Sequence, residues 1–357
     1  MLKPSIPAGV TETRPMLIIS VDHEVFGNGS GCLDACVRRP VDRMLSVAEK
    51  FSAPLTFFVE ALEFEAMQVA GIDGIDSVIA QLTVAYKAGH DIQLHIHPQW
   101  DGAVYDGTDW RVNEKLWRMG DIDEERLVRL LKQGKSWIGR QLSSDFPEYE
   151  CLAFRAGGWC IQPSDAVIKA LLQLGFQIDS TVAPGLQNLA AGEWADFRDV
   201  PDQPYWRTNG DVCREANSGL WEIPILTGKV GRLRHLQAVK KCRSFGSNGM
   251  ALGCVGSYQG ANSKLQAWRG KFGKLMSSGN VMLDFSTMPT DILVQITRDW
   301  MAKYRTQSSY LPLVGIAHTK NFTDYSEKNM NEYLQWAIDE GIACSTYRDF
   351  LGVVNGR

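Results

Sequence analysis

Residues 89–100 read GHDIQLHIHPQW, a buried strand with two histidines at its end. Apolar and polar residues alternate from Leu94 to His97, so the sequence predicts a strand whose His95 and His97 side chains project to one face. Pro98 cannot continue the hydrogen-bond ladder and ends the strand. Chemistry in α/β folds gathers at such strand ends. Two imidazoles on one face suit a zinc-like metal, and the alternative is a pair of hydrogen-bonded core histidines.

A second strand end carries two acids. Residues 16–21 form a largely apolar run with β-branched residues, typical of a buried parallel strand, and Asp22, His23 and Glu24 follow it. Alternation places the two carboxylates on one face and His23 on the other. Carboxylates so close repel unless a cation lies between them or one is protonated. We therefore expect Glu24 to bind the metal beside the two histidines and Asp22 to act as general base. The simpler interpretation is an acidic strand end that faces solvent or caps a helix.

Composition is that of a water-soluble enzyme. The 357 residues are 45% hydrophobic and 22% charged, enough for one large domain or two smaller ones. A net charge of −4 offers no basic field for nucleic acid. The first residues contain no apolar signal-peptide core and no run approaches a membrane span, so we expect a cytoplasmic location. The eight cysteines form no C-x-x-C pair and are expected to be free thiols.

Strand-like and helix-like segments alternate along the chain, which predicts parallel strands joined by helical crossovers in an α/β sheet or barrel. Strands are expected at residues 16–21, 54–59, 92–97, 152–155, 176–179, 281–285, 313–318 and 342–345. Helices are expected at residues 38–51, 71–88, 121–142, 162–175, 290–304 and 329–340.

The alternation of strand-like and helix-like segments stops between about residues 186 and 280. This segment contains a basic stretch from Lys229 to Lys274 in an otherwise acidic chain. One interpretation is a solvated helical insertion. The other is a patch that closes over the entrance of the active site and binds a phosphate on the substrate carrier. The cations are Arg232, Arg234, Lys240, Lys241, Arg243, Lys264, Arg269, Lys271 and Lys274.

The late strand at residues 313–318 ends in His318. Histidine exchanges protons near neutral pH, so His318 suits a general acid if it points into the same mouth as Asp22. Alternatively, it hydrogen-bonds a local backbone group.

With these motifs the chain resembles the polysaccharide deacetylases of the NodB-homology group, carbohydrate esterase family 4, and is most similar to the branch found with lipopolysaccharide and O-antigen loci. The resemblance runs from about residue 16 to residue 350 and covers the middle segment poorly. It implies an α/β fold, a distorted (β/α)7-type barrel, with one catalytic domain over residues 1–357 and an insertion at about 186–280.

The resemblance also implies roles for particular residues. Asp22 maps to the catalytic base, while Glu24, His95 and His97 map to the metal ligands. Two departures from the family pattern stand out: His23 separates two acids that the family has adjacent, and Gln99 occupies the position where a spacing of four would place the second histidine. His23 or His90 could therefore replace an expected ligand.

Three further motifs of the family have counterparts. Arg155, in Phe154-Arg155-Ala156-Gly157-Gly158-Trp159, matches the arginine that orients the base; Asp179 matches an aspartate at a later strand end; and His318 matches the acid.

The implied activity is the metal-dependent removal of an N-acetyl group from an amino sugar of a cell-surface polysaccharide or its precursor, with zinc as the expected metal and a substrate that could be nucleotide- or lipid-linked. Aromatic residues expected to stack on the sugar are Trp100, Trp159, Tyr205 and Trp206. Two alternatives remain: a hydrolase of a small non-sugar amide, which a compact closed pocket would favour, and a non-catalytic carbohydrate-binding relative.

Overall fold

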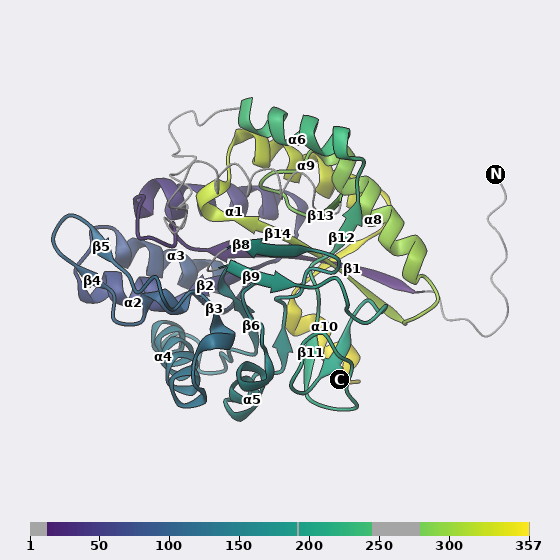
Figure 1. Cartoon of the computed structure of the whole chain (residues 1–357). Helices are drawn as coiled ribbons and strands as arrows, with labels where there is room; N and C mark the ends of the chain where they lie inside the picture. Colours follow the sequence, from purple (N-terminus) through teal and green to yellow (C-terminus); the bar gives the residue numbers. More distant parts are fainter. Residues whose placement is uncertain (1–12, 191–192, 245–278, 357) are drawn as a thin grey trace, which may run out of the picture.

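The computed structural model describes residues 13–190, 193–244 and 279–356, and a curled sheet with helices around it forms the centre (Figure 1). The strands are β1 Arg14–His23, β2 Leu55–Glu60, β3 Asp91–Ile96, β4 Val104–Tyr105, β5 Trp110–Arg111, β6 Ala153–Ala156, β7 Ile178–Asp179, β8 Gln187–Ala190, β9 Glu193–Asp196, β10 Trp206–Thr208, β11 Leu220–Glu222, β12 Thr227–Lys229, β13 Asn280–Met282, β14 Tyr310–His318 and β15 Ala343–Ser345. The helices are α1 Arg39–Phe51, α2 Ala61–Val69, α3 Ile75–Lys87, α4 Glu124–Leu142, α5 Asp165–Gln173, α6 Arg232–Ser244, α8 Thr290–Tyr304, α9 Asp324–Asp339 and α10 Tyr347–Val354. Short turns of π or 3-10 helix are η1 Asp34–Arg38, η2 Pro98–Trp100, η3 Met119–Asp121, η4 Gly157–Trp159 and η5 Thr319–Asn321.

The main sheet has nine strands, and eight of them follow the order β10-β11-β7-β6-β3-β2-β1-β14. Each neighbouring pair from β11 to β14 is parallel, whereas β10 joins the edge antiparallel to β11. The ninth strand, β15, runs parallel to the first half of β1. Because the parallel strands share a direction, their carboxyl ends lie along one edge. The predicted α/β class is confirmed.

The chain after β11 bridges the two sides of the curled sheet. The backbone N–H of Ile225 donates to the carbonyl of Val182 at 2.8 Å, and that of Leu226 donates to the carbonyl of Val314 at 2.9 Å. The first bond is made to the segment after β7 and the second to β14, so residues 225 and 226 link the two sides of the curled sheet. The result is a distorted barrel, as the resemblance implied.

Local sequence explains the main elements. Leu17, Ile18 and Ile19 in β1 are fully buried, as a strand covered on both faces requires. Helix α4 begins where Asp123 accepts a hydrogen bond from the N–H of Arg126 at 2.9 Å, and acids in its first turn favour the positive end of the helix dipole.

Several features differ from the sequence expectations. The strand expected at 281–285 is β13, Asn280–Met282, which pairs antiparallel with β12 outside the main sheet. Helix α2 was not predicted, because it is buried over much of its surface and shows no apolar stripe. The short α10 was also missed. The segment 186–280, expected to be an insertion, includes β10 and β11, which belong to the main sheet.

No helix in the described ranges is long and apolar enough to cross a membrane. Five of the described cysteines are free thiols, as expected for most of them: Cys32, Cys36, Cys151, Cys213 and Cys344. Cys254 lies outside the described residues.

Packing between β14 and the 283–285 segment leaves no room for a side chain at Gly315. A Cβ there would lie 2.4 Å from Cε2 of Phe285. Gly315→Ala should therefore lower the free energy of unfolding by about 1–3 kcal/mol, the usual effect of overpacking. Urea unfolding followed by circular dichroism measures this. Gly352→Ala in α10 is the control, since a Cβ there meets nothing within 4 Å. Equal stability of the two variants would contradict this packing.

Candidate active site and metal centre

Strand register brings the predicted residues to one place. Asp22 near the end of β1 is level with His318 at the end of β14, and His95 in β3 is level with Arg155 in β6. Residues level with each other in neighbouring parallel strands project to the same face. The expected base, acid, arginine and first histidine thus converge at the carboxyl edge of the sheet.

Glu24 lies buried between a lysine and the two histidines. Its Oε1 accepts a hydrogen bond from Nζ of Lys320 at 2.7 Å. Its Oε2 has no hydrogen-bond partner and lies 3.8 Å from Nε2 of His95 and 3.2 Å from Nδ1 of His97. Burial opposes ionisation, but Lys320 and the imidazoles outweigh it, so the pKa of Glu24 is below its usual value. One ionised oxygen therefore faces both histidines.

The backbone fixes the ring of His95. Nδ1 lies 2.9 Å from the carbonyl oxygen of Arg155, which only accepts hydrogen bonds, so the ring proton belongs on Nδ1. Nε2 then keeps its lone pair, and it is buried without a partner. Burial lowers the pKa of His95, so the ring is in the neutral form that binds metals.

Glu60, at the end of β2, holds His97. Its Oε2 accepts the backbone N–H of His97 and lies 2.9 Å from Nδ1 of that ring, while Oε1 caps α2 by accepting the N–H of Leu62 at 3.2 Å. Burial lowers the pKa of His97 to about 3. Burial, with the charges of Glu63 and Glu24, raises the pKa of Glu60 well above its usual value. Such outer partners orient metal-binding histidines.

Sequence reasoning missed Glu60 and Lys320. Glu60 is one residue beyond the predicted strand 54–59, and an acid at the end of a neighbouring parallel strand was a usable signal. Lys320 follows His318 by two residues in η5, and no local pattern indicates that it reaches Glu24.

Arg155 contacts Asp22, the residue that the resemblance maps to the base. Nη1 of the buried guanidinium donates to Oδ1 of Asp22 at 2.7 Å, and Oδ2 lies 3.5 Å from Nε2 of His318. Burial opposes ionisation of Asp22, but Arg155 and the nearby histidines outweigh it and hold its pKa below the usual value. Asp22 is therefore an ionised carboxylate next to an imidazole, a suitable pair for moving protons.

Asp284 is a further acid beside His318. The backbone N–H of His318 donates to Oγ of Ser286 at 2.9 Å, and Asp284 accepts the N–H of Ser286 at 2.8 Å. Burial raises the pKa of Asp284, and the nearby His318 partly offsets this. Asp284 falls within the strand predicted at 281–285, but only the fold shows that it lies beside His318.

Asp179 lies beneath the site rather than in it. Its Oδ1 accepts a hydrogen bond from Oγ1 of Thr181 at 2.7 Å, and that hydroxyl accepts the N–H of Ala156 at 3.0 Å. Burial raises the pKa of both Asp179 and Glu222, its neighbour in β11. Asp179 therefore supports the end of β6 and is not among the residues that line the cavity.

Neither His23 nor His90 joins the metal-like group. His23 points to the opposite face, with its ring edge-on to Phe57 and Phe64 at centroid distances of 5.8 and 5.1 Å. His90 lies just before β3, and its Nδ1 accepts a hydrogen bond from the N–H of Leu55, the first residue of β2, at 3.0 Å. Alternation along β1 had already assigned His23 to that face.

A cavity of about 190 Å³ opens above these groups. Its lining residues are Asp22, Glu24, Phe26, Gly27, Asn28, His97, Trp117, Gly158, Trp159, Asn188, His318, Lys320 and Asn321. Of the aromatic residues expected to stack on sugar, only Trp159 lines it. Trp100 and Trp206 are core residues, and Tyr205 packs on Phe350.

Gly157 leaves space for His97. A Cβ at Gly157 would lie 2.4 Å from Cδ2 of that ring. Gly158 and Trp159 follow with φ values of +58° each, a left-handed turn that glycine adopts easily and tryptophan rarely does. Gly157 thus makes room for the ring of His97.

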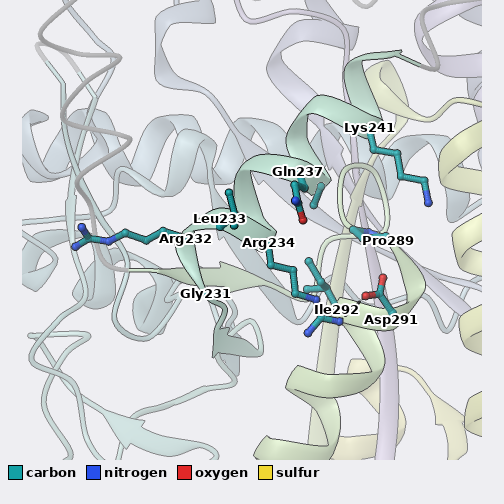
Figure 2. Close-up of a pocket in the computed structure, with 10 residues that line it drawn as sticks. Gly231, Arg232, Leu233, Arg234, Gln237, Lys241, Pro289, Asp291 and Ile292 are labelled. Atoms are coloured by element: carbon teal, nitrogen blue, oxygen red, sulfur yellow. Dashed lines mark hydrogen bonds and ion pairs between the residues drawn. The ribbon is translucent and has the colours of Figure 1, made fainter.

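The basic stretch begins at Lys229 in β12 and continues in α6, which lies beside α8 and α9 (Figure 1). Arg232, Arg234 and Lys241 line a separate hollow of about 650 Å³ between α6 and the start of α8. Figure 2 shows Arg234 turned toward Asp291, with which it forms an ion pair, and Arg232 pointing away. This hollow shares no lining residue with the cavity above Asp22. Arg243 lies in the last turn of α6 and its side chain is not described, and Lys264 to Lys274 lie outside the described residues.

The residues present fit a divalent metal. Ligand atoms of Glu24, His95 and His97 lie within 4.8 Å of one another. Glu24 Oε2 and His95 Nε2 are buried polar atoms without a partner, which native proteins rarely leave unexplained. Two imidazoles and one carboxylate are also the ligand set of many catalytic zinc sites, which keep a further position open.

His95→Ala and His97→Ala should each lose the bound metal, because two remaining ligands hold an ion far more weakly. Elemental analysis of purified protein after dialysis measures the content. His90→Ala is the matched control and should keep the metal of the unchanged protein. Full occupancy in both His95→Ala and His97→Ala would show that the metal lies elsewhere.

No family model matches the sequence, and curated proteins offer no match. Several solved structures, in contrast, are similar to this chain. A candidate polysaccharide deacetylase from Mycobacterium smegmatis is 14% identical with a TM-score of 0.50, over 99% of this chain and 93% of that one. A 4-alpha-glucanotransferase from Thermococcus litoralis is 12% identical with a TM-score of 0.51, over 95% of this chain and 40% of that one. A CE4 family pseudoenzyme from Bacillus anthracis is 10% identical with a TM-score of 0.42, over 94% and 65%.

At such low identity the likeness concerns the fold alone. The chain has the fold of the polysaccharide deacetylases, which confirms the resemblance at that level. The glucanotransferase is as similar in structure, so the reaction has to be argued from the side chains in the site.

Proposed function

We propose that the protein is a metal-dependent hydrolase that removes the acetyl group from an N-acetylated amino sugar of a cell-surface polysaccharide or its precursor. One observation carries this proposal: a three-residue metal-like group with two unpartnered ligand atoms lies beside an Asp–His pair, and four of these five residues line one cavity. The donor set favours zinc.

The chain's own residues divide the work of amide hydrolysis. When bound, the divalent ion supplies Lewis acidity, polarising the acetamide carbonyl and acidifying the attacking water. Asp22 takes the proton of that water, while Arg155 keeps the carboxylate ionised and oriented. His318 gives a proton to the leaving nitrogen as the C–N bond breaks, which yields acetate and a free amine.

A second function is favoured by the size of the cavity. About 190 Å³ is less than the roughly 300–1,000 Å³ of pockets for drug-sized ligands, and a small non-sugar amide fits such a space. The two tryptophans and three asparagines of the lining favour the sugar, because indole faces stack on rings and amides bond hydroxyls.

The direct test is incubation of the zinc-loaded protein with N-acetylglucosamine, UDP-N-acetylglucosamine, N-acetylated oligosaccharides and small amides, followed by mass spectrometry. We expect loss of an acetyl group from a sugar. Turnover of small amides alone would support the second function, and bound metal without any turnover would indicate a non-catalytic relative.

Asp22→Asn should keep its metal and lose at least about 10²-fold in rate, the scale of general-base removal. Acetate release with metal content measured in parallel tests this. Asp179→Asn is the matched control: because Asp179 lies outside the cavity, this variant should stay within about tenfold of the unchanged rate. Near-normal turnover by Asp22→Asn would place the base elsewhere.

A further inference from the structure

Loops from around the curled sheet form the wall of the cavity. Five strands contribute: β1, β3, β6, β7 and β14 are each followed by a segment that lines it. In the sheet order from β7 to β14, only β2 adds no lining residue among those described. The hollow, called the well below, is thus lined from several sides of the curled sheet, whereas an extended polymer needs a groove open at both ends.

Trp117 closes one part of this wall. A Cβ placed on Gly27 would lie 3.4 Å from Cη2 of Trp117, and one on Gly158 would lie 3.7 Å from its Nε1. The indole therefore reaches from the loop after β1 to the loop after β6. Its ring centroid is 6.4 Å from that of His97, so it stands beside the metal-like group.

Trp159 forms the neighbouring part of the wall with a strained backbone. A φ of +58° is a genuine outlier for a bulky residue, and such strain is kept where the position serves a site. The ring of Trp159 meets the ring of His318 edge-on, at a centroid distance of 6.1 Å. The turn thus holds an indole next to the proposed acid.

Volume and chemistry limit what the well can hold. About 190 Å³ has room for one ring-sized unit. Trp117 and Trp159 offer flat apolar faces, and Asn188 and Asn321 add amide groups at the rim.

We propose that the well accepts one terminal N-acetylated sugar residue, at the end of a saccharide or on its carrier, and excludes the interior residues of an extended polysaccharide. Trp117 and Trp159 set this limit. The inference rests on the proposed deacetylase function and adds the position on the substrate at which it acts.

The test uses the zinc-loaded full chain with β-1,4-linked N-acetylglucosamine oligomers of one to six units and with UDP-N-acetylglucosamine. Tandem mass spectrometry maps which unit loses its acetyl group. We expect loss only from a terminal unit or from the UDP-linked sugar, and the two probes tell saccharide ends from carriers. Loss of acetyl groups from interior units would contradict the proposal that the well accepts only terminal residues, but it would leave the deacetylase function intact. No loss from any probe contradicts both.

Variants of the wall test the assigned residues. Trp117→Ala and Trp159→Ala should open the well and raise the ratio of interior to terminal deacetylation by about tenfold or more. Trp117→Phe is the control and should stay end-selective, because it keeps a flat ring. Metal content and the unfolding midpoint confirm that each variant is folded. Strict end selectivity in both folded alanine variants would overturn the role of these tryptophans.

Discussion

The site depends on one buried guanidinium. Arg155 is fully buried, and its nitrogens donate to Asp22, to the hydroxyl of Ser20 at 2.9 Å, to the carbonyl of Ser180 at 2.8 Å and to the hydroxyl of Tyr347 at 3.2 Å. These partners belong to β1, the segment after β7, and α10. A buried charge is tolerated only when it is paired and its donors are satisfied, so Arg155 joins elements far apart in sequence and orients the base at once.

Charge balance explains how Lys320 and the buried acids around Glu24 are arranged. Glu24, Glu60 and Glu63 are buried close together, and Lys320 is the cation that reaches Glu24. Burial opposes the charge on Lys320, but Glu24 outweighs it and raises the pKa of the lysine. Lys320 occupies one oxygen of Glu24 and leaves the other to the histidines. A divalent ion at that oxygen would complete the balance of a group rich in carboxylates.

Short-range patterns predicted the centre of the site well. Two-residue alternation assigned His95 with His97 and Asp22 with Glu24 to shared faces, and the alternation of strands and helices predicted the α/β fold. The register between strands then brought these faces together, as parallel pairing requires.

The remaining parts depend on contacts that no local pattern reveals. Trp117 comes from a long connection, and its place in the wall depends on two glycines elsewhere in the chain. Asp179 sits at a strand end like Asp22 and His318, but unlike them it does not line the cavity. The depth of a side chain below the cavity and the path of a loop depend on tertiary structure. The sequence therefore identified the strand ends but not which of their side chains reach the cavity.

The most direct test of the central claim is anomalous diffraction at the zinc absorption edge from crystals of the zinc-loaded protein. The account predicts one buried peak bonded to Oε2 of Glu24 and to Nε2 of His95 at about 2.0–2.2 Å, with His97 as the third ligand. A peak bonded to other residues, or no peak between these three side chains, would contradict it.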